Sequence, residues 1–340
     1  MSTRQLRAGI SGYGLAGRYF HAPFLRAAGF EVVGATTNNA ERIAHLKEDF
    51  PNATAYSNIE VLLAQDLDLL VVASANVAHA SDAIAGLKAG VAVVVDKPMG
   101  RTYAEAKSIT DVAQETGSLL TTFFNRRWDS DALTIKKAIK EGVLGDIFRI
   151  DSRFERFREE ANPQSWRERS PAADGGGNLL DLQPHLVSLA LDWFGPAKLV
   201  HASVRSIRGL SDDDVVLVLR HDSGVDSYLS ASAIVGAPGP RIRLMGSKGA
   251  LVITELDKQE PLLRSGINPE NGGWSVDTRT PAKLHRGDEV SDYPAVAGNY
   301  TQFYTEVYAS INGEGVMPVS IKDALEVALI IDQAREISIR

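Results

Sequence analysis

The first third of the chain alternates short apolar runs with segments whose apolar residues recur at helical spacing. Buried strands are predicted at 6–11, 30–36, 67–73, 91–95 and 118–123. Helices are predicted between them, at 17–28, 40–48, 58–64, 77–89 and 103–116. Strands that alternate with helices predict βαβ units and one parallel sheet with right-handed crossovers.

Beyond about residue 130 the pattern changes to strand-rich segments. A helix at 130–141 precedes an alternating run at 145–157, and further β-rich runs follow at 197–207, 213–235 and 241–256. The last two runs contain DSG and GSKG, which are typical of hairpins. Helices are predicted at 181–194, 299–312 and 320–335. We therefore expect an α/β protein in which a parallel-sheet domain, 1–122, precedes an α+β domain, 123–340. The second domain carries a large, mainly antiparallel open sheet, and the final helix packs back on the first domain.

Composition is that of an ordinary globular protein of two domains. The 340 residues are 44% hydrophobic and 23% charged, with a net charge of −7. This charge argues against a nucleic-acid or anionic-membrane partner. Cysteine is absent, which excludes disulfides and thiolate chemistry. The polar N-terminus and the short apolar runs indicate neither a signal peptide nor a membrane helix, so we expect a soluble cytoplasmic protein.

A glycine motif joins the first predicted strand to the first predicted helix. It reads Gly12-Tyr13-Gly14-Leu15-Ala16-Gly17. In a βαβ unit such glycines allow a tight turn, close approach of the backbone to a pyrophosphate, and close packing of helix on strand. A glycine-rich turn without a ligand is the alternative, but this placement favours a dinucleotide site.

The second predicted strand lacks the acid that usually holds the adenine ribose of NAD. Thr36, Thr37 and Asn38 stand at its end, and Arg42 lies one turn into the next helix. An acid there would repel a 2′-phosphate, so its absence favours NADP, or use of both nucleotides. Arg42 could equally be a solvated charge on a helix face.

Lys97 follows the fourth strand of the predicted sheet, at the carboxyl end where open α/β sheets bind ligands. Its neighbours Asp96 and Pro98 restrict its backbone. A cation at this place could polarise a substrate oxygen or lower the pKa of a neighbouring base. The alternative is a surface lysine that extends into solvent.

Asp181 and His185 are four residues apart, so on one helix they would share a face. Histidine is the natural proton carrier near neutral pH, and a dehydrogenase needs such a group for the hydroxyl proton. Alternatively, Asp181 caps the helix and His185 packs in the core. No two of His45, His201, His221 and His285 share metal-ligand spacing with an acid, and we expect no metal.

Five segments together resemble the Gfo/Idh/MocA family of NAD(P)-dependent oxidoreductases, and the resemblance spans essentially the whole chain. They are GYGLAG at 12–17, SANVAH at 74–79, DKP at 96–98, NRRWDSD at 125–131 and GGGNLLDLQPH at 175–185. Three segments look most like the NADP-dependent scyllo-inositol 2-dehydrogenase branch: GYGLAGRYFHAPFL, NRRWDSDALTIKKAIKEGVLGD and PENGGW. The resemblance implies a Rossmann domain and a second domain whose open sheet forms homodimers or homotetramers.

The resemblance also implies roles for particular residues. The catalytic set would be Lys97, Asp181 and His185. The cofactor-binding set beyond the glycine motif would be Thr36, Thr37, Asn38, Arg42, Ser74, Ala75, Asn76, His79, Asp96 and Lys97. The substrate pocket would include Asn125, Arg126, Trp166 and Gln183.

Several positions depart from the family pattern. Asp96 replaces a glutamate, Ala75 a proline, and Asn38 the arginine of the inositol branch. Gln183 and Pro184 replace a pair that contains glycine, and Ser188 stands where an acid often follows.

The resemblance implies an NAD(P)-dependent dehydrogenase or reductase acting on a secondary alcohol of a sugar, inositol or related polyol. Two alternatives are a reductase of a non-sugar carbonyl or dihydrodiol and a non-catalytic NAD(P)-sensing regulator.

Overall fold

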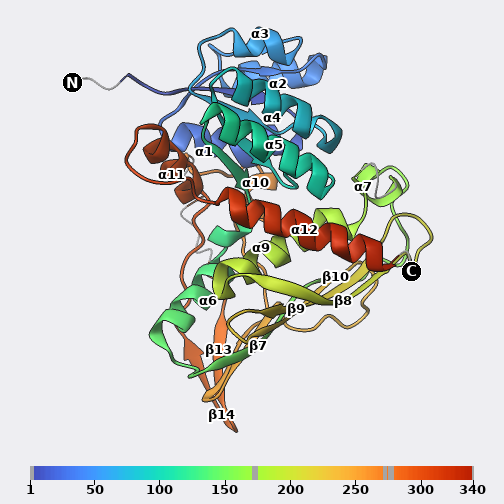
Figure 1. The fold of residues 1–340 in the computed structure, drawn as a ribbon. Helices are drawn as coiled ribbons and strands as arrows, with labels where there is room; N and C mark the ends of the chain where they lie inside the picture. Colours follow the sequence, from blue (N-terminus) through green and yellow to red (C-terminus); the bar gives the residue numbers. More distant parts are fainter. Residues whose placement is uncertain (1–3, 171–174, 271–273, 275–278, 339–340) are drawn as a thin grey trace.

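A computed structural model describes residues 4–170, 175–270, 274 and 279–338, without the side chains of residues 166, 167 and 338. Two sheets, each with its own helices, form the two halves of the molecule (Figure 1). None of the described helices has the length and apolar composition needed to span a membrane.

The first sheet is parallel, as the sequence predicts. Its order is β3-β2-β1-β4-β5-β6, and every neighbouring pair is parallel. The strands are β1 (Arg7–Ser11), β2 (Glu31–Thr36), β3 (Thr54–Tyr56), β4 (Leu69–Val72), β5 (Ala92–Asp96) and β6 (Leu120–Phe123). The sequence pattern did not predict β3, because three residues are too few to show an alternation. The expected domain boundary between residues 122 and 123 falls inside β6.

Helices connect the successive strands of this sheet along the chain. They are η1 (Ala16–His21, a π-helix), α1 (Ala22–Ala27), α2 (Ala40–Asp49), α3 (Ile59–Leu63), η2 (Asn76–Ala78, a 3₁₀ helix), α4 (His79–Lys88) and α5 (Tyr103–Thr116). The side chains of Asn39, Asn58 and Thr102 accept hydrogen bonds from the first turns of α2, α3 and α5. Such caps satisfy backbone N–H groups that have no partner within the helix, and so they define where each helix starts.

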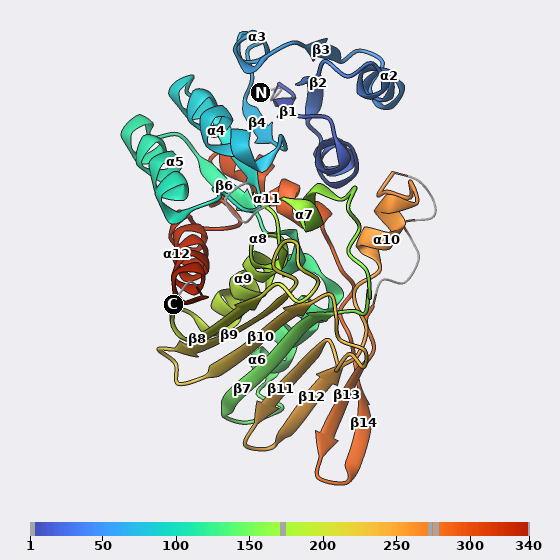
Figure 2. The ribbon, with the colours of Figure 1, turned by 90° about the vertical axis from the view of Figure 1, so that its right-hand side faces the viewer.

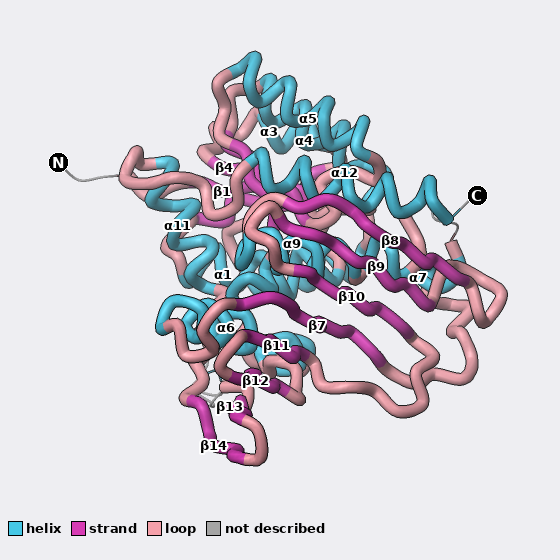
Figure 3. Tube along the Cα trace, turned by 60° about the horizontal axis from the view of Figure 1, so that its bottom comes forward, coloured by secondary structure: helices cyan, strands magenta, loops and turns pink. Residues whose placement is uncertain are grey.

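The second sheet has eight strands in the order β14-β13-β12-β11-β7-β10-β9-β8. Only β7 and β10 pair in parallel; the other pairs are antiparallel, as the sequence predicts. The strands are β7 (Ile147–Glu155), β8 (Ala197–Arg205), β9 (Asp214–His221), β10 (Asp226–Ser232), β11 (Ile242–Gly246), β12 (Gly249–Ile253), β13 (Ala282–Arg286) and β14 (Glu289–Tyr293). Figure 3 shows one face of this sheet open, with α6 and α9 behind the other face. The β13–β14 hairpin was not predicted, because polar and charged residues outnumber apolar ones in its strands.

The helices of the second domain surround the junction with the first. They are η3 (Asn125–Trp128, a 3₁₀ helix), α6 (Ser130–Glu141), α7 (Trp166–Arg169), α8 (Asn178–Asp181), α9 (Gln183–Phe194), α10 (Gln259–Arg264), α11 (Thr301–Ile311) and α12 (Ile321–Ser338). In Figure 2, α7 and α10 lie at the level between the two sheets. The single helix expected at 181–194 is wrong in one respect, since the chain breaks at Leu182 between α8 and α9. Pro184 has no N–H to extend a continuous helix through this point.

The final helix, α12, holds the two domains together (Figure 1). It packs against α5 of the first domain and against α9 and β8 of the second. Two hydrogen bonds reinforce the first contact: the Tyr103 N–H donates to Asp332 Oδ2 at 2.6 Å, and Arg335 Nη2 donates to the Arg101 carbonyl at 3.1 Å. Because α12 touches both sheets, it fixes the space between them.

Candidate active site

A cavity of about 530 Å³ lies where the two domains meet. Its walls come from the glycine loop after β1, the ends of β5 and β6, helices α8 and α9, and the chain that follows β7. Eight of the residues singled out in the sequence line it: Leu15, Ala16, Asp96, Lys97, Asn125, Arg126, Asp181 and His185. The fold therefore brings the glycine motif and the three catalytic candidates to one place.

The glycine loop shows which of its positions must lack a side chain. Gly12 has φ +89°, and a Cβ there would lie 2.7 Å from the Ser74 Cα. A Cβ on Gly17 would lie 2.2 Å from the Gly12 carbonyl oxygen. Gly14 differs, because the nearest atom to its Cβ position is Arg42 Cζ at 3.6 Å. The fold itself requires Gly12 and Gly17, whereas Gly14 could carry a Cβ without a clash in the protein, so close approach of a dinucleotide pyrophosphate is the reason for a glycine there.

The other predicted cofactor residues near β2 differ in what they can contact. Tyr13 is buried and donates its hydroxyl hydrogen to Asp49 Oδ2 at 2.8 Å, so its ring faces the core. Thr36 Oγ1 accepts from the Gly12 N–H at 3.0 Å and thus supports the glycine loop. The exposed Asn38 donates to the Ser57 carbonyl at 3.3 Å. Of this group, Arg42 is the residue whose charged end lies beside Gly14.

The segment 74–79 connects the glycine loop to the loop that carries Lys97. Ser74 Oγ donates to Asp82 Oδ2 at 2.8 Å. The buried His79 ring lies between two carbonyl oxygens, with Nδ1 2.8 Å from the Pro98 oxygen and Nε2 3.2 Å from the Ser74 oxygen. Asn76 lies against Gly175 of the second domain, whose Cβ position is 2.8 Å from Asn76 Nδ2. These contacts fix the relative positions of three loops at the cavity.

Lys97 reaches across the domain junction to Asp181. Its Nζ donates to the Asp181 carbonyl oxygen at 2.7 Å and to Asp181 Oδ1 at 2.8 Å. Both side chains are largely buried, with 16% of Lys97 and 24% of Asp181 exposed. Asp181 is the last residue of α8 and caps neither α8 nor α9. Lys97 is thus held in the cavity wall, and the surface-lysine alternative does not describe it.

His185 lies in the first turn of α9, with 6% of its surface exposed. Burial lowers its pKa well below the usual value, and the charges of Lys97 and Arg126 lower it further, while Asp181 acts in the opposite direction. The imidazole is therefore neutral at neutral pH. A neutral imidazole that lines the cavity is able to accept a proton from a bound hydroxyl.

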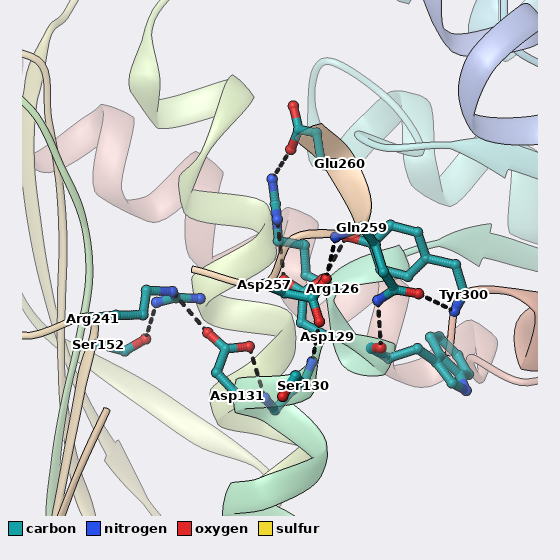
Figure 4. Close-up of polar contacts among 12 residues, drawn as sticks. Arg126, Asp129, Ser130, Asp131, Ser152, Arg241, Asp257, Gln259, Glu260 and Tyr300 are labelled. Carbon is teal, nitrogen blue, oxygen red and sulfur yellow. Dashed lines mark hydrogen bonds and ion pairs between the residues drawn. The ribbon is translucent and has the colours of Figure 1, made fainter. Parts of the chain in front are cut away.

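A buried polar network holds Arg126 at the cavity (Figure 4). Arg126 Nη1 donates to Asp129 Oδ2 at 3.1 Å, and its Nη2 pairs with Glu260 of α10. Burial raises the pKa of the Asp129 carboxyl to about 7; Arg126 opposes this rise, and the nearby Asp131 and Asp257 add to it. The Tyr300 hydroxyl donates to the other Asp129 oxygen at 2.5 Å. These contacts attach α10 to the cavity wall through Arg126.

The predicted substrate residues Gln183 and Trp166 differ from Asn125 and Arg126, which line the cavity. Gln183 is fully buried, and its amide donates to the carbonyl oxygens of Val215 at 3.1 Å and Leu229 at 3.2 Å. It therefore attaches α9 to the second sheet and does not line the cavity. The backbone of Trp166 begins α7, but its side chain lies outside the described part of the chain.

Several cavity residues were not found by sequence reasoning. They are Phe20, Phe123, Arg156, Arg158, Glu168, Asn178, Arg208, Asp212, Asp213, Glu260 and Arg264. Asn178 stands inside the GGGN motif, so that motif could have indicated it. The charged residues belong to no motif and meet only in three dimensions; Arg208 Nη1, for example, pairs with Glu168 Oε2 at 3.2 Å. Within the described ranges, no three His, Asp or Glu side chains are grouped so as to hold a metal ion.

Comparison with known proteins identifies both halves of the chain. Residues 6–124 match the Gfo/Idh/MocA profile described as "Oxidoreductase family, NAD-binding Rossmann fold", and residues 136–338 match that of the same family's C-terminal alpha/beta domain. A scyllo-inositol 2-dehydrogenase (NADP+) of Bacillus subtilis is 33% identical, covering 98% of this chain and 94% of the relative. A 1,5-anhydro-D-fructose reductase of Ensifer adhaerens is 28% identical, over 86% and 89%. A solved Bacillus subtilis oxidoreductase superimposes with a TM-score of 0.89 at 31% identity, over 99% and 97%.

The room for a side chain at Gly14, where a Cβ would make only ordinary contact with the Arg42 guanidinium, leads to a first prediction. In Gly14→Ala the new methyl group has room in the free protein, so the melting temperature should stay near that of the wild type. The methyl group would occupy the space where a pyrophosphate approaches, and affinity for both NAD and NADP should fall about tenfold or more. Calorimetric titration with each nucleotide measures this. Gly236→Ala, whose new Cβ would meet only Phe157 at 3.9 Å, is the control. Unchanged affinity in Gly14→Ala would exclude this loop as the pyrophosphate site.

The burial of His185 leads to a second prediction, on the pH dependence of stability. Its native pKa lies below the unfolded value of about 6.5, so the unfolded state binds the proton first as pH falls. Relative to His185→Gln, the wild type should lose about 1.4 kcal/mol of unfolding free energy between pH 7.5 and 5.5. Urea denaturation at several pH values measures this difference. A difference that does not vary with pH would show that His185 titrates normally in the folded protein.

Proposed function

Because the chain belongs to the Gfo/Idh/MocA family of oxidoreductases, we propose that it interconverts a secondary alcohol and a ketone of a sugar, inositol or related polyol. The family makes it an NAD(P)-dependent oxidoreductase. One observation carries the finer assignment: Lys97, Asp181 and His185 line the same cavity as the glycine loop.

The residues have complementary roles in this proposal. The cofactor, held at the glycine loop, supplies the acceptor or donor of hydride. Lys97 donates a hydrogen bond to the substrate oxygen and stabilises the negative charge that develops there as the O–H bond breaks. His185 takes the proton of that bond, or returns it in reduction. Asp181 fixes the lysine through two contacts, and so Lys97 needs no rearrangement to reach the substrate.

The size and polarity of the cavity support a sugar or polyol substrate. A volume of about 530 Å³ lies in the range of small-molecule sites. Amide and charged side chains, among them Asn125 and Arg126, line it and could bond several hydroxyl groups. The two named relatives carry an inositol and an anhydrosugar in their names, which supports a substrate of this class.

For the cofactor we propose a preference for NADP. The end of β2 offers Thr36, Thr37 and Asn38 but no carboxylate, so nothing there repels a 2′-phosphate. The guanidinium of Arg42 lies beside Gly14, close to where the adenine ribose of a bound dinucleotide would sit. An arginine is well suited to a phosphate because it presents several donors in one plane.

Association of copies through the second sheet belongs to the same proposal. The open face of this sheet carries Tyr228, with the Arg149 guanidinium 4.5 Å from its ring centroid. It also carries Asp151, to which Arg149 and Arg243 donate hydrogen bonds. A broad face without helices, ordered by such pairs, suits a homodimer or homotetramer.

Substitution of the lysine tests the proposed function. Lys97→Met removes the donor to the substrate oxygen but keeps a side chain of similar length, and kcat should fall at least about a hundredfold. Affinity for the cofactor should remain within about threefold, because the glycine loop is unaffected. The assay follows cofactor reduction against a panel of polyols and sugars, with both NAD and NADP. Lys88→Met, at an exposed position, is the control. Normal turnover by Lys97→Met would contradict the role of the lysine, and cofactor binding without turnover by the wild type would favour a regulator.

Substitution of Arg42 tests the cofactor preference. Arg42→Ala should weaken binding of NADPH about tenfold, since a charge-assisted contact to phosphate is lost. Binding of NADH, which lacks the 2′-phosphate, should change less than about twofold and is the internal control. Fluorescence titration with both nucleotides measures the ratio. Equal losses for the two nucleotides would exclude recognition of the 2′-phosphate by Arg42.

A further inference from the structure

His21 is a buried histidine for which the proposed chemistry has no use. It is the last residue of η1, in the segment RYFHAPF, and none of its surface is exposed. Its ring packs 4.5 Å from that of Phe123, a cavity residue at the end of β6. A fully buried imidazole requires partners for its nitrogens, and the two groups that face it define its place in the structure.

Each ring nitrogen of His21 faces a different domain. Nδ1 lies 2.6 Å from the Tyr304 hydroxyl oxygen on α11. Nε2 lies 3.9 Å from Asp96 Oδ2 at the end of β5, which is longer than a hydrogen bond but close enough for electrostatic attraction. Nε2 has no hydrogen-bond partner within the described part of the chain. The carboxylate is thus the group that a hydrogen on Nε2 would approach.

The Tyr304 hydroxyl and the Asp96 carboxylate together indicate which nitrogen carries the hydrogen. Burial raises the pKa of this phenol well above its usual value, so it keeps its hydrogen and can donate it to Nδ1. With Nδ1 as acceptor, the imidazole hydrogen is on Nε2 and is directed at Asp96. The opposite tautomer would place a lone pair against the carboxylate, which is unfavourable at a buried site.

Asp96 links the orientation of His21 to the backbone of Lys97. Its Oδ1 accepts a hydrogen bond from the Lys97 N–H at 2.8 Å, while Oδ2 faces His21. Burial acts to raise the pKa of the Asp96 carboxyl, but His21, together with Lys97 and His79, brings it below the ordinary value. The ionised carboxylate therefore restrains the backbone at the residue whose Nζ reaches Asp181.

We propose that His21, oriented by Tyr304, is a positioning residue that holds the Asp96 carboxylate and thereby the Lys97 backbone. The inference rests on the proposed function, because the position of Lys97 has a chemical consequence only if the lysine contacts the substrate. It assigns a role to Asp96, whose side chain is one methylene shorter than the glutamate usual in the family. The shorter carboxylate bonds the neighbouring backbone N–H and depends on His21 for its second oxygen.

Two amide variants test the proposal. The amide nitrogen of Gln in His21→Gln reaches about as far as Nε2, so a donor to Asp96 remains. In His21→Asn the amide reaches only about as far as Nδ1, so that donor is lost. We expect His21→Gln to retain at least about a third of the wild-type kcat, and His21→Asn to lose about tenfold, with cofactor affinity unchanged in both. Tyr19→Phe, in the same helix, is the control, and thermal unfolding compares the stability of the variants.

A purely structural role would make activity follow melting temperature. Equal kcat values for His21→Gln and His21→Asn, or the reverse order, would overturn the proposal.

Nitrogen NMR of the ¹⁵N-histidine-labelled wild-type protein is a second test that does not require turnover. A hydrogen on Nε2 of His21 is expected, and one on Nδ1 alone would overturn the inference. If the wild type oxidises no polyol, the proposed function fails, whereas the NMR result still decides the orientation of His21.

Discussion

The contact between Lys97 and Asp181 is the interaction on which the rest of the site depends. It joins the end of β5 in the first domain to the end of α8 in the second, through a side-chain and a main-chain oxygen. A buried ion pair contributes little net stability, because both charges lose their hydration. Its value here is geometric, since it places a cation at a defined point of the cavity. The packing of α12 against both domains helps to fix that point.

Around this contact, buried groups hold each charge where the reaction would need it. His185 is kept neutral by burial and by the neighbouring cations, so it is ready to accept a proton. Arg126 is held by Asp129 and Glu260, which belong to different segments of the second domain. Asp96 and His21 restrain the lysine from the side of the first domain. Charges ordered in advance need little reorganisation during a reaction, which is the main source of electrostatic catalysis.

The features that could be predicted from the sequence are those set by residues adjacent in the chain. Apolar runs indicate the strands of the parallel sheet, and the glycine motif between β1 and η1 indicates the loop at the cavity. The fold brings Lys97, Asp181 and His185 to one cavity, as expected. The expectation that Asp181 and His185 share one helix was wrong, since Leu182 separates α8 from α9. The break at Leu182 was not predicted, although Pro184 lacks the N–H of a continuous helix, and the β13–β14 hairpin has too few apolar residues to show a strand pattern. Arg208 and Glu168, forty residues apart in the chain, pair only because the loop between β8 and β9 meets α7 at the cavity. Gln183 is the opposite case. Its place in a motif predicted a role in substrate binding, but its side chain bonds the second sheet.

The most direct measurement is a crystal structure of the complex with NADP and a non-reacting polyol. We predict one polyol oxygen within about 3 Å of both Lys97 Nζ and a His185 ring nitrogen, with the nicotinamide beside the carbon that bears it. Lys97 should still contact Asp181. A polyol bound away from Lys97, or a lysine turned to solvent while the cofactor is bound, would contradict the account.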